Sequence, residues 1–223
     1  MTCYASFEHY YLKKGFLPEA LINFVALLGW HPQSAQEIYT IAELEKEFSI
    51  KRIQKSGAVF DSEKLAWMNS QYIMNMDLGT IAKLSRSYYI EHGLDISEEQ
   101  KYFLVVDNAR RRVNILSEMP NESQMFYGNL DFSTDNINLV NCETSQILLK
   151  AIHTSLIGAV GCNGNGFKAI VMEAGNDMGV KGKDLFFPIR IALYGDPKGP
   201  DIPHIFSILG RDETLSRLFQ VIK

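Results

Sequence analysis

The sequence has few cysteines and no pattern of metal-binding side chains. Its three cysteines, Cys3, Cys142 and Cys162, lie too far apart for a disulfide framework or a Cys-x-x-Cys metal site. The five histidines show no spacing typical of metal ligands. We therefore expect reduced thiols and no metal site.

Long hydrophobic runs are absent as well. No stretch approaches the ~18 apolar residues that span a membrane, and no basic-then-apolar leader marks secretion. We expect a cytoplasmic protein without a membrane partner. The apolar–polar alternation typical of strands is nearly absent too, which predicts an all-α fold.

The charge balance is slightly acidic. Twenty-two Lys and Arg residues against 26 Asp and Glu give a formal net charge of −4. This argues against indiscriminate binding to DNA or other polyanions, although a specific RNA site needs only a local basic surface. Basic residues do cluster, in the segments 51–55, 110–112 and 181–190.

Helical spacing of apolar residues runs along most of the chain. Thr40 with Glu43, and Ser97 with Gln100, have the spacing of capping boxes, and Asp61 is a suitable N-cap. We predict mostly loop over 127–144 and a domain boundary near residue 94. The predicted helices cover 6–14, 18–28, 40–48, 61–76, 81–92, 97–118, 145–160, 166–176, 185–194, 202–209 and 212–222.

The segment 15–30, GFLPEALINFVALLGW, has the clearest helix signals in the chain. Pro18 suits a first helical turn, and Gly29 suits a left-handed helix end. Four large apolar residues recur at i, i+3, i+4 and i+7 and predict one buried face: Leu21, Phe24, Val25 and Leu28. Alone, this pattern indicates only a helix packed in a core.

Two further segments accompany it in the order found in one family. They are FDSEKLAWMNSQYI at 60–73 and GKDLFFPIRIALYG at 182–195. Together the three segments closely resemble bacterial-type glutamyl-tRNA synthetases, class I enzymes that join glutamate to its tRNA. The resemblance covers nearly the whole chain. It implies a helical stem-contact domain over 1–94, at the inner corner of the tRNA, and a helical anticodon-binding domain over 95–223.

The HIGH-like and KLSKR-like motifs of this family's nucleotide-binding domain do not occur in the chain. The sequence therefore resembles the C-terminal portion of a synthetase, either as a fragment or as a free-standing relative. The resemblance implies that ATP and Mg²⁺ act in the missing domain of the parent enzyme. It implies no catalytic residue and no cofactor in this segment, a monomer, and tRNA for glutamate as partner, with tRNA for glutamine as a second candidate.

Arg110, Arg111 and Arg112 fall in the middle of the long helix predicted after residue 97. Successive helical residues point about 100° apart, so at most two of the three can address one ligand. One interpretation is a solvated face paired with Asp107 or Glu118. The resemblance instead assigns the reading of the first anticodon base to Arg112, with Arg110 as the alternative within the run.

Arg190 lies inside an apolar helix, where a charge needs a partner, a ligand or a path for its head group to water. The segment GDPKGPDI that follows is a rigid turn. The resemblance assigns Arg190, Gly199, Pro200 and Ile202 to anticodon contacts, whereas the residues alone indicate a packed arginine and a turn.

Two weaker candidates remain. The resemblance places Lys64 and Asn69 on a helix near the tRNA stem, where they could contact phosphates or ribose. The segment 161–166, GCNGNG, mimics a phosphate loop, but a helix is predicted before it and no Gly-Lys-Ser/Thr follows. The competing functions are a free-standing helical module that binds RNA or protein, and a small helical enzyme that uses this loop.

Overall fold

The computed structural model describes residues 7–54, 57, 59–128 and 130–223. Throughout these residues every regular element is a helix, and the only strand-like pairing is an isolated bridge between Trp30 and Ile53. The predicted all-α class is confirmed. Cys3, and Lys55 at the end of the basic segment 51–55, lie outside the described residues. The chain divides into two compact units between Ser123 and Gln124.

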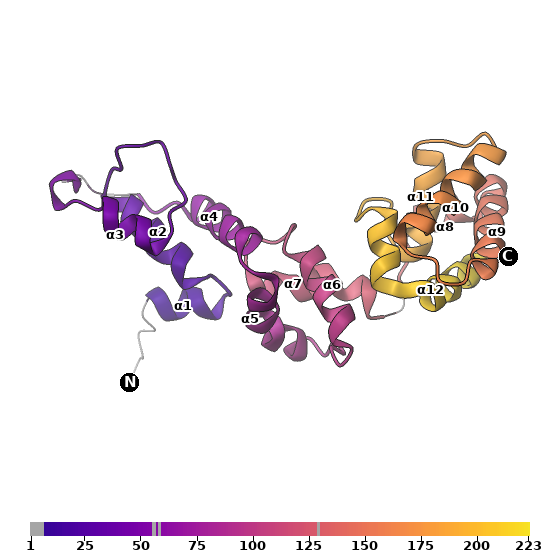
Figure 1. Ribbon diagram of the computed structural model, residues 1–223, viewed down its shortest axis with the longest axis horizontal. Coiled ribbons are helices and arrows are strands. Elements are labelled where there is room, and N and C mark those ends of the chain that lie inside the picture. The colour runs from indigo at the N-terminus through magenta and orange to yellow at the C-terminus, as the bar shows by residue number, and fades with distance from the viewer. Residues whose placement is uncertain (1–6, 55–56, 58, 129) are drawn as a thin grey trace. The chain divides into compact units, whose positions relative to one another are not determined.

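The first unit is built from short helices (Figure 1). Its core joins α2 to α4 and then α5 to α6 and α7. In chain order the helices are α1 (Phe7–Lys13), α2 (Pro18–Gly29), α3 (Ile41–Glu47), the 3-10 turn η1 (Ile50–Arg52), α4 (Ser62–Asn75), α5 (Leu78–Glu91), α6 (Glu99–Ala109), η2 (Leu116–Glu118) and α7 (Met119–Ser123).

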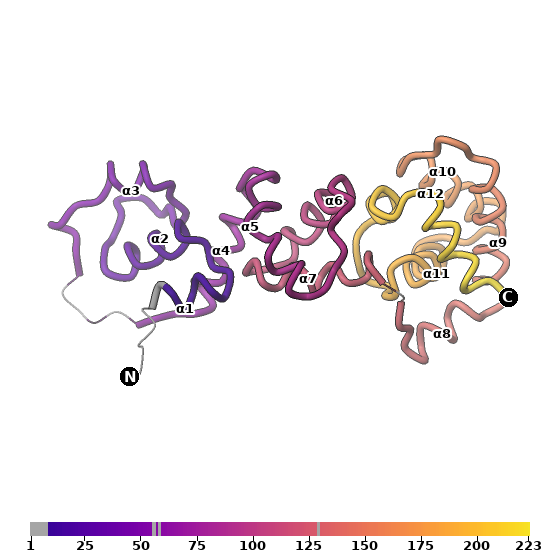
Figure 2. Tube along the Cα trace, turned by 90° about the horizontal axis from the view of Figure 1, so that it is seen from below, coloured from indigo at the N-terminus to yellow at the C-terminus, as the bar shows by residue number. Residues whose placement is uncertain are grey.

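The second unit packs four longer helices, α9 to α12, around one another, as both overall views show (Figures 1 and 2). Phe167 of α10 stacks on Phe206 of α12 with ring centroids 4.6 Å apart. Its elements are η3 (Gln124–Phe126), α8 (Thr134–Asn141), α9 (Glu143–Gly158), α10 (Gly164–Asp177), α11 (Lys183–Tyr194) and α12 (Ile202–Val221). Gly210, at φ 74°, kinks α12 where the sequence predicts two helices.

Two of the three predicted local caps are confirmed. Thr40 and Glu43 form the predicted capping box of α3, and the Asp61 carboxylate accepts from the first backbone N–H groups of α4. In α2, Leu21 and Phe24 are buried as predicted, but Val25 is 52% exposed. The inward face of α2 is therefore shifted towards Leu17 and Ala20.

Several predicted helix ends are wrong, and each was set by a contact with a distant or unrecognised partner. Gly29 is not left-handed, because Trp30 leaves α2 in an extended conformation and the Gly29 carbonyl accepts from the amide of Gln54 at 2.9 Å. Gly79 lies inside α5, which starts earlier because Asp77 caps it. The loop predicted over 127–144 contains α8, which Ser133 caps.

The long helix predicted over 97–118 is also wrong. Residues 97–118 instead contain α6, a turn and η2, and the Ser97 capping box is absent because α6 starts after Glu98. Helices α5 and α6 pack together across residue 94, where the Tyr102 hydroxyl donates to the carbonyl of Ala82 at 2.7 Å. The compact units therefore divide about thirty residues later in the chain than the predicted boundary.

Candidate functional site

The turn between α11 and α12 is held in one shape by several independent constraints. Gly195 ends α11 in the left-handed region at φ 87°, which favours glycine. The Asp196 carboxylate accepts from the amide of Lys198 at 2.6 Å, and Asp201 caps α12 by accepting from the amide of His204. A Cβ at Gly199 would approach the Tyr194 ring to 2.7 Å. The turn therefore needs glycine at both positions.

Arg190 holds this turn from the inside. Its Nε donates to the Pro200 carbonyl and its Nη1 donates to the Pro197 carbonyl, each at 3.0 Å. Proline carbonyls in a turn have no helix partner, so the guanidinium satisfies them. Within the part of the chain that the structure describes, the Nη2 group of Arg190 has no hydrogen bond. The half-buried side chain thus keeps donors free while it positions the turn.

The other predicted turn residues differ in exposure. Gly199 is exposed, whereas Pro200 is buried and Ile202 is only 2% exposed. Backbone at Gly199 is therefore accessible to a ligand, while the side chains of Pro200 and Ile202 pack into the second unit. Those two residues support the turn in this conformation and do not form its surface.

A second arginine, Arg217 on α12, braces the same region and was missed in the sequence. It is 4% exposed and donates through Nη1 to the carbonyls of Met125 at 2.7 Å and Leu193 at 2.8 Å. Its Nε donates to Glu213, one helical turn earlier, at 2.7 Å. The i, i+4 spacing of Glu213 and Arg217 was visible in the sequence, but it indicated only a surface ion pair.

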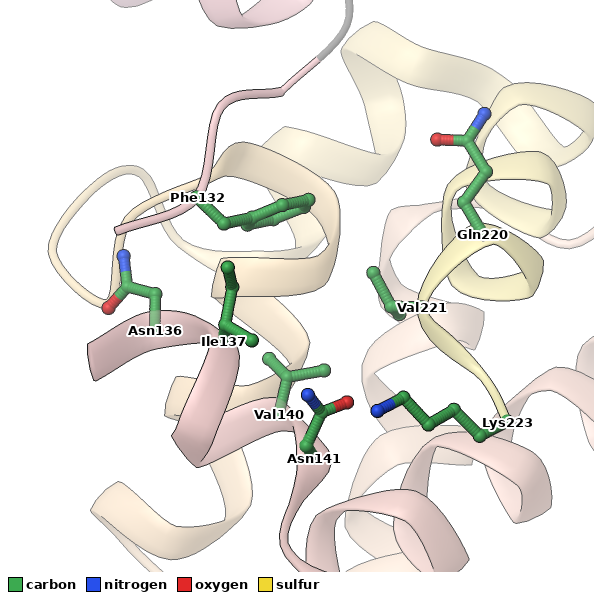
Figure 3. Close-up of a pocket in the computed structure, with 8 residues that line it drawn as sticks. All are labelled: Phe132, Asn136, Ile137, Val140, Asn141, Gln220, Val221 and Lys223. Carbon is green, nitrogen blue, oxygen red and sulfur yellow. The ribbon is translucent and has the colours of Figure 1, made fainter. Parts of the chain in front are cut away.

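A small cavity lies beside the start of this turn, between α8 and the end of α12. Asn136 connects the two features, because its amide donates to the Gly195 carbonyl at 2.9 Å. Figure 3 shows apolar side chains facing the cavity and the Lys223 amino group directed towards Asn141. The cavity has a volume of about 180 Å³ and is lined by Phe132, Asn136, Ile137, Val140, Asn141, Gln220, Val221 and Lys223.

The arginine run lies in the first unit, and the structure corrects its setting. Arg110 to Arg112 form the turn after α6 and not the middle of a helix. Arg110 is drawn inward, where it forms a 2.6 Å ion pair with Asp107 and donates to the Met76 carbonyl. Arg111 pairs with the other Asp107 oxygen at 3.0 Å.

Arg112 is the most available of the three guanidinium groups as a base-reading candidate. It is exposed, and its Nη1 donates to the uncharged Asn108 amide oxygen at 3.0 Å. A neutral amide acceptor is a weaker partner than a carboxylate, although Asn108 itself is only 2% exposed. The pairing predicted with Asp107 is present for Arg110 and Arg111, whereas Glu118 accepts from the amides of residues 114 and 115 instead.

The two α4 candidates behave differently from each other. Lys64 is on the surface and forms a 2.5 Å ion pair with Glu37, with side chains 39% and 46% exposed. Asn69 is fully buried: its Oδ1 accepts from the Leu17 amide at 2.8 Å, and its Nδ2 donates to the Asn114 carbonyl. A buried amide with both ends bonded cannot contact an RNA stem, so that expectation for Asn69 is wrong.

A buried polar network next to Asn69 was not recognised in the sequence. Asn23 on α2 accepts from the Tyr39 amide and from the Tyr72 hydroxyl, each at 2.7 Å. Burial raises the pKa of Tyr72 to about 12. The signal was available, since Asn23 lies on the apolar face of α2, where a polar residue needs partners.

The glycine-rich segment 161–166 does not have the geometry of a phosphate loop. It follows helix α9, and its Asn163 side chain itself caps α10 by accepting from the Gly166 amide. A Cβ at Gly164 would approach the Pro203 carbonyl oxygen to 2.5 Å. Glycine is therefore needed there for the close crossing of α10 and α12.

The described residues contain no group of three or more His, Cys, Asp or Glu side chains that could hold a metal ion. None of their helices is both long enough and apolar enough to cross a bilayer. Cys142 and Cys162 are free thiols.

Two family models match the chain. The model described as the anticodon binding domain matches residues 72–222, and the model described as the catalytic domain of class I (E and Q) tRNA synthetases matches residues 3–67. The relatives are longer. Glutamate–tRNA ligase of Natranaerobius thermophilus is 38% identical over 216 residues, which are 93% of this chain and 44% of that protein.

Other similar proteins agree. Glutamate–tRNA ligase of Bacillus cereus is 34% identical over 222 residues, which are 97% of this chain and 46% of that protein. The crystal structure of a glutamate tRNA ligase from Elizabethkingia meningosepticum in complex with its amino acid superposes with a TM-score of 0.85 at 27% identity, over 95% of this chain and 42% of that one. The chain thus spans less than half the length of these relatives.

Proposed function

The chain belongs to the anticodon-binding domain family, and we propose that it is the tRNA-recognising, C-terminal portion of a glutamate–tRNA ligase. The resemblance seen in the three sequence segments is confirmed by the relatives. The parent enzyme would use ATP and Mg²⁺ to charge tRNA with glutamate in the cytoplasm. This segment would act as a monomer. It would contribute affinity for tRNA, place the tRNA correctly on the enzyme and discriminate between tRNAs.

The observation that supports this proposal most is that the rigid turn between α11 and α12 lies beside hydrogen-bond donors that a ligand can reach. Arg190 fixes the turn through two carbonyls and retains a free Nη2 group, and Gly199 exposes backbone beside it. Unstacked bases are recognised on their Watson–Crick edges by planar donors and by rigid backbone. We propose that this surface contacts the anticodon, with Pro200 and Ile202 as its support.

Arg112 is proposed to read the first anticodon base, with Arg110 as the less accessible alternative. A guanidinium presents paired donors in one plane, and Arg112 uses only Nη1 to bond the Asn108 oxygen among the described residues, so its other donors are available to a base. Lys64 is proposed to contact a phosphate of the tRNA stem after it leaves Glu37. The choice between tRNA for glutamate alone and tRNA for glutamine as well depends on the third codon letter, which the first anticodon base pairs with.

The described residues do not fit an ATP–Mg²⁺ site. They contain no cluster of metal ligands, and the one segment that imitates a phosphate loop has its helix N-terminus capped by Asn163. We therefore assign no catalytic step to them. We expect no ATP–pyrophosphate exchange above background by the 223-residue chain, and measurable exchange would contradict the assignment of chemistry to another domain.

Binding of the chain to two transcripts tests the function directly. One is tRNA for glutamate, and the other differs from it only in the three anticodon bases. At matched ionic strength we expect about tenfold weaker binding or more for the altered transcript, because base contacts and not phosphate contacts distinguish the two. Equal affinities would contradict anticodon recognition and favour the free-standing RNA- or protein-binding module.

A further inference from the structure

In the first unit, a buried amide joins two segments that are far apart in the sequence. Asn69 of α4 accepts from the Leu17 amide at 2.8 Å and donates to the Asn114 carbonyl at 2.5 Å. Its side chain is fully buried. One residue therefore connects the start of α2 to the chain just after the arginine run.

Two more hydrogen bonds connect the same two segments. The Leu116 amide donates to the Gly15 carbonyl at 3.0 Å, and the Ser117 hydroxyl donates to the Lys14 carbonyl at 2.9 Å. Gly15 is left-handed at φ 88°, and a Cβ there would approach the Ser117 amide nitrogen to 2.7 Å. We call this set of four bonds, between residues 14–17 and 114–117 with Asn69, the seam.

The seam joins the parts of the chain that match different families. Residues 14–17 fall in the stretch that matches the catalytic-domain model, and residues 114–117 fall in the stretch that matches the anticodon-binding model. Asn69 lies in the short interval, 68–71, that neither match covers. Arg112, the base-reading candidate, lies two residues before Asn114. The bonds therefore tie the backbone next to Arg112 to residues 14–17, in the part of the chain that matches the catalytic-domain model.

We propose that Asn69 is a positioning residue for Arg112, and that it sets the place of the Arg112 guanidinium relative to the part of the chain that matches the catalytic domain. This proposal rests on the proposed function of Arg112. The side chain of Arg112 is exposed, and its Nη1 donates to one amide oxygen of the preceding helix, that of Asn108. Its position therefore depends on the backbone of 110–114. The C-terminal end of that backbone is held by the seam, together with the local bonds from the amides of residues 114 and 115 to Glu118.

The test compares substitutions that break the seam with one that does not. Asn69→Ala removes two of the four bonds, and Ser117→Ala removes one bond at the less buried end. Asn75→Ala is the control, because Asn75 is an exposed residue of the same helix and, among the described residues, its side-chain amide donates to the Gln71 carbonyl and not to the seam. All are compared with Arg112→Gln in the full chain, after thermal unfolding has shown that each variant is folded at the assay temperature.

The first measurement is the ratio of Kd values for two tRNAs that differ only at the first anticodon base. We expect Asn69→Ala to lower this ratio by about threefold to tenfold and Ser117→Ala to lower it less, because displacement of a reading group costs part of its discrimination. Asn75→Ala should leave the ratio unchanged. A loss of stability alone would not move the ratio per folded molecule, so an unchanged ratio in Asn69→Ala, with a lowered ratio in Arg112→Gln, would overturn the proposal.

The second measurement needs no RNA. Hydrogen exchange at the Leu17 and Leu116 amides, together with the rate of tryptic cleavage after Arg111 and Arg112, reports whether Asn69 holds the turn. We expect faster exchange and cleavage in Asn69→Ala than in Asn75→Ala. If Arg112→Gln does not change the tRNA ratio, the proposed reading by Arg112 fails, and unchanged exchange and cleavage in Asn69→Ala would separately overturn the positioning role.

Discussion

The two turns that carry the base-reading candidates are held in opposite ways. The turn after α6 supplies arginines from its own sequence, and its backbone is fixed by bonds to residues about a hundred positions earlier in the chain, such as Leu116 to Gly15. The turn after α11 contains no arginine. It is fixed by Arg190, which lies on the preceding helix and binds two turn carbonyls.

Because of this difference, the arginine proposed to read a base in the first turn is not the group that holds that turn, whereas Arg190 both holds the second turn and is proposed to contact the anticodon. Arg112 can change partners without loosening its turn, because its recorded bond is to a side chain of α6. Arg190 cannot be removed without releasing the Pro197 and Pro200 carbonyls. Substitutions in the first turn should therefore affect mainly discrimination, and substitutions in the second should affect stability and binding together.

The largest effect on stability is expected at Arg217, the buried arginine of α12. Arg217→Met should lower the free energy of unfolding by about 3 kcal/mol, because the Met125 and Leu193 carbonyls lose their charged donor in a buried place. Urea unfolding of both proteins measures this change. Glu213→Gln is the control, since that carboxylate is 45% exposed, and a similar loss in the control would show that the ion pair and not the carbonyl contacts matters.

Arg190→Ala comes next and should show both effects at once. Affinity for an anticodon stem-loop should fall by about 1–3 kcal/mol if the free Nη2 group contacts a base. The melting temperature should fall as well, because two carbonyl bonds are lost. Arg190→Lys can restore one carbonyl bond but not planar donors. If Arg190→Lys binds RNA as well as the natural protein, Arg190 supports the turn and does not contact the anticodon.

Arg112→Gln should have a smaller effect on stability and a selective effect on RNA. We expect relaxed discrimination at the first anticodon base, with total tRNA affinity reduced by no more than about 1 kcal/mol, since backbone contacts elsewhere persist. Two stem-loops that differ only at that base give the measurement. Arg110→Gln is the comparison, because it also loses the Asp107 ion pair and the Met76 bond. If Arg110→Gln alone relaxes discrimination, the reading residue is Arg110.

The smallest effect is expected at Lys64. Its ion pair with Glu37 is exposed, so Glu37→Gln should change the free energy of unfolding by no more than about 0.5 kcal/mol. If Lys64 contacts the tRNA stem, Glu37→Gln should free it and strengthen tRNA binding slightly at low salt, whereas Lys64→Gln should weaken it. If the tRNA affinity of both variants depends on salt concentration to the same degree, Lys64 does not contact the tRNA.

The sequence by itself determined several helix starts, because the signals for them lie next to one another in the chain. Pro18, the Thr40–Glu43 capping box and Asp61 each act within one helical turn, so their effect is visible in a short stretch of sequence. The three family segments likewise indicated the fold class and the kind of partner.

The tertiary structure alone decided the features that depend on distant contacts. Helix α6 ends at Ala109 with no glycine or proline to stop it, and the chain beyond it is bonded to Gly15 and Asn69. Asn69 follows the helical spacing of the buried residues Leu65 and Met68, but the carbonyl and amide that it bonds come from segments about fifty positions away, so its partners are not visible in the spacing. Arg190 was recognised as unusual because a charge on an apolar helix needs a partner. Its partners are the Pro197 and Pro200 carbonyls, and it reaches them because the turn folds back onto α11. The spacing of residues along the sequence does not show that the turn folds back in this way.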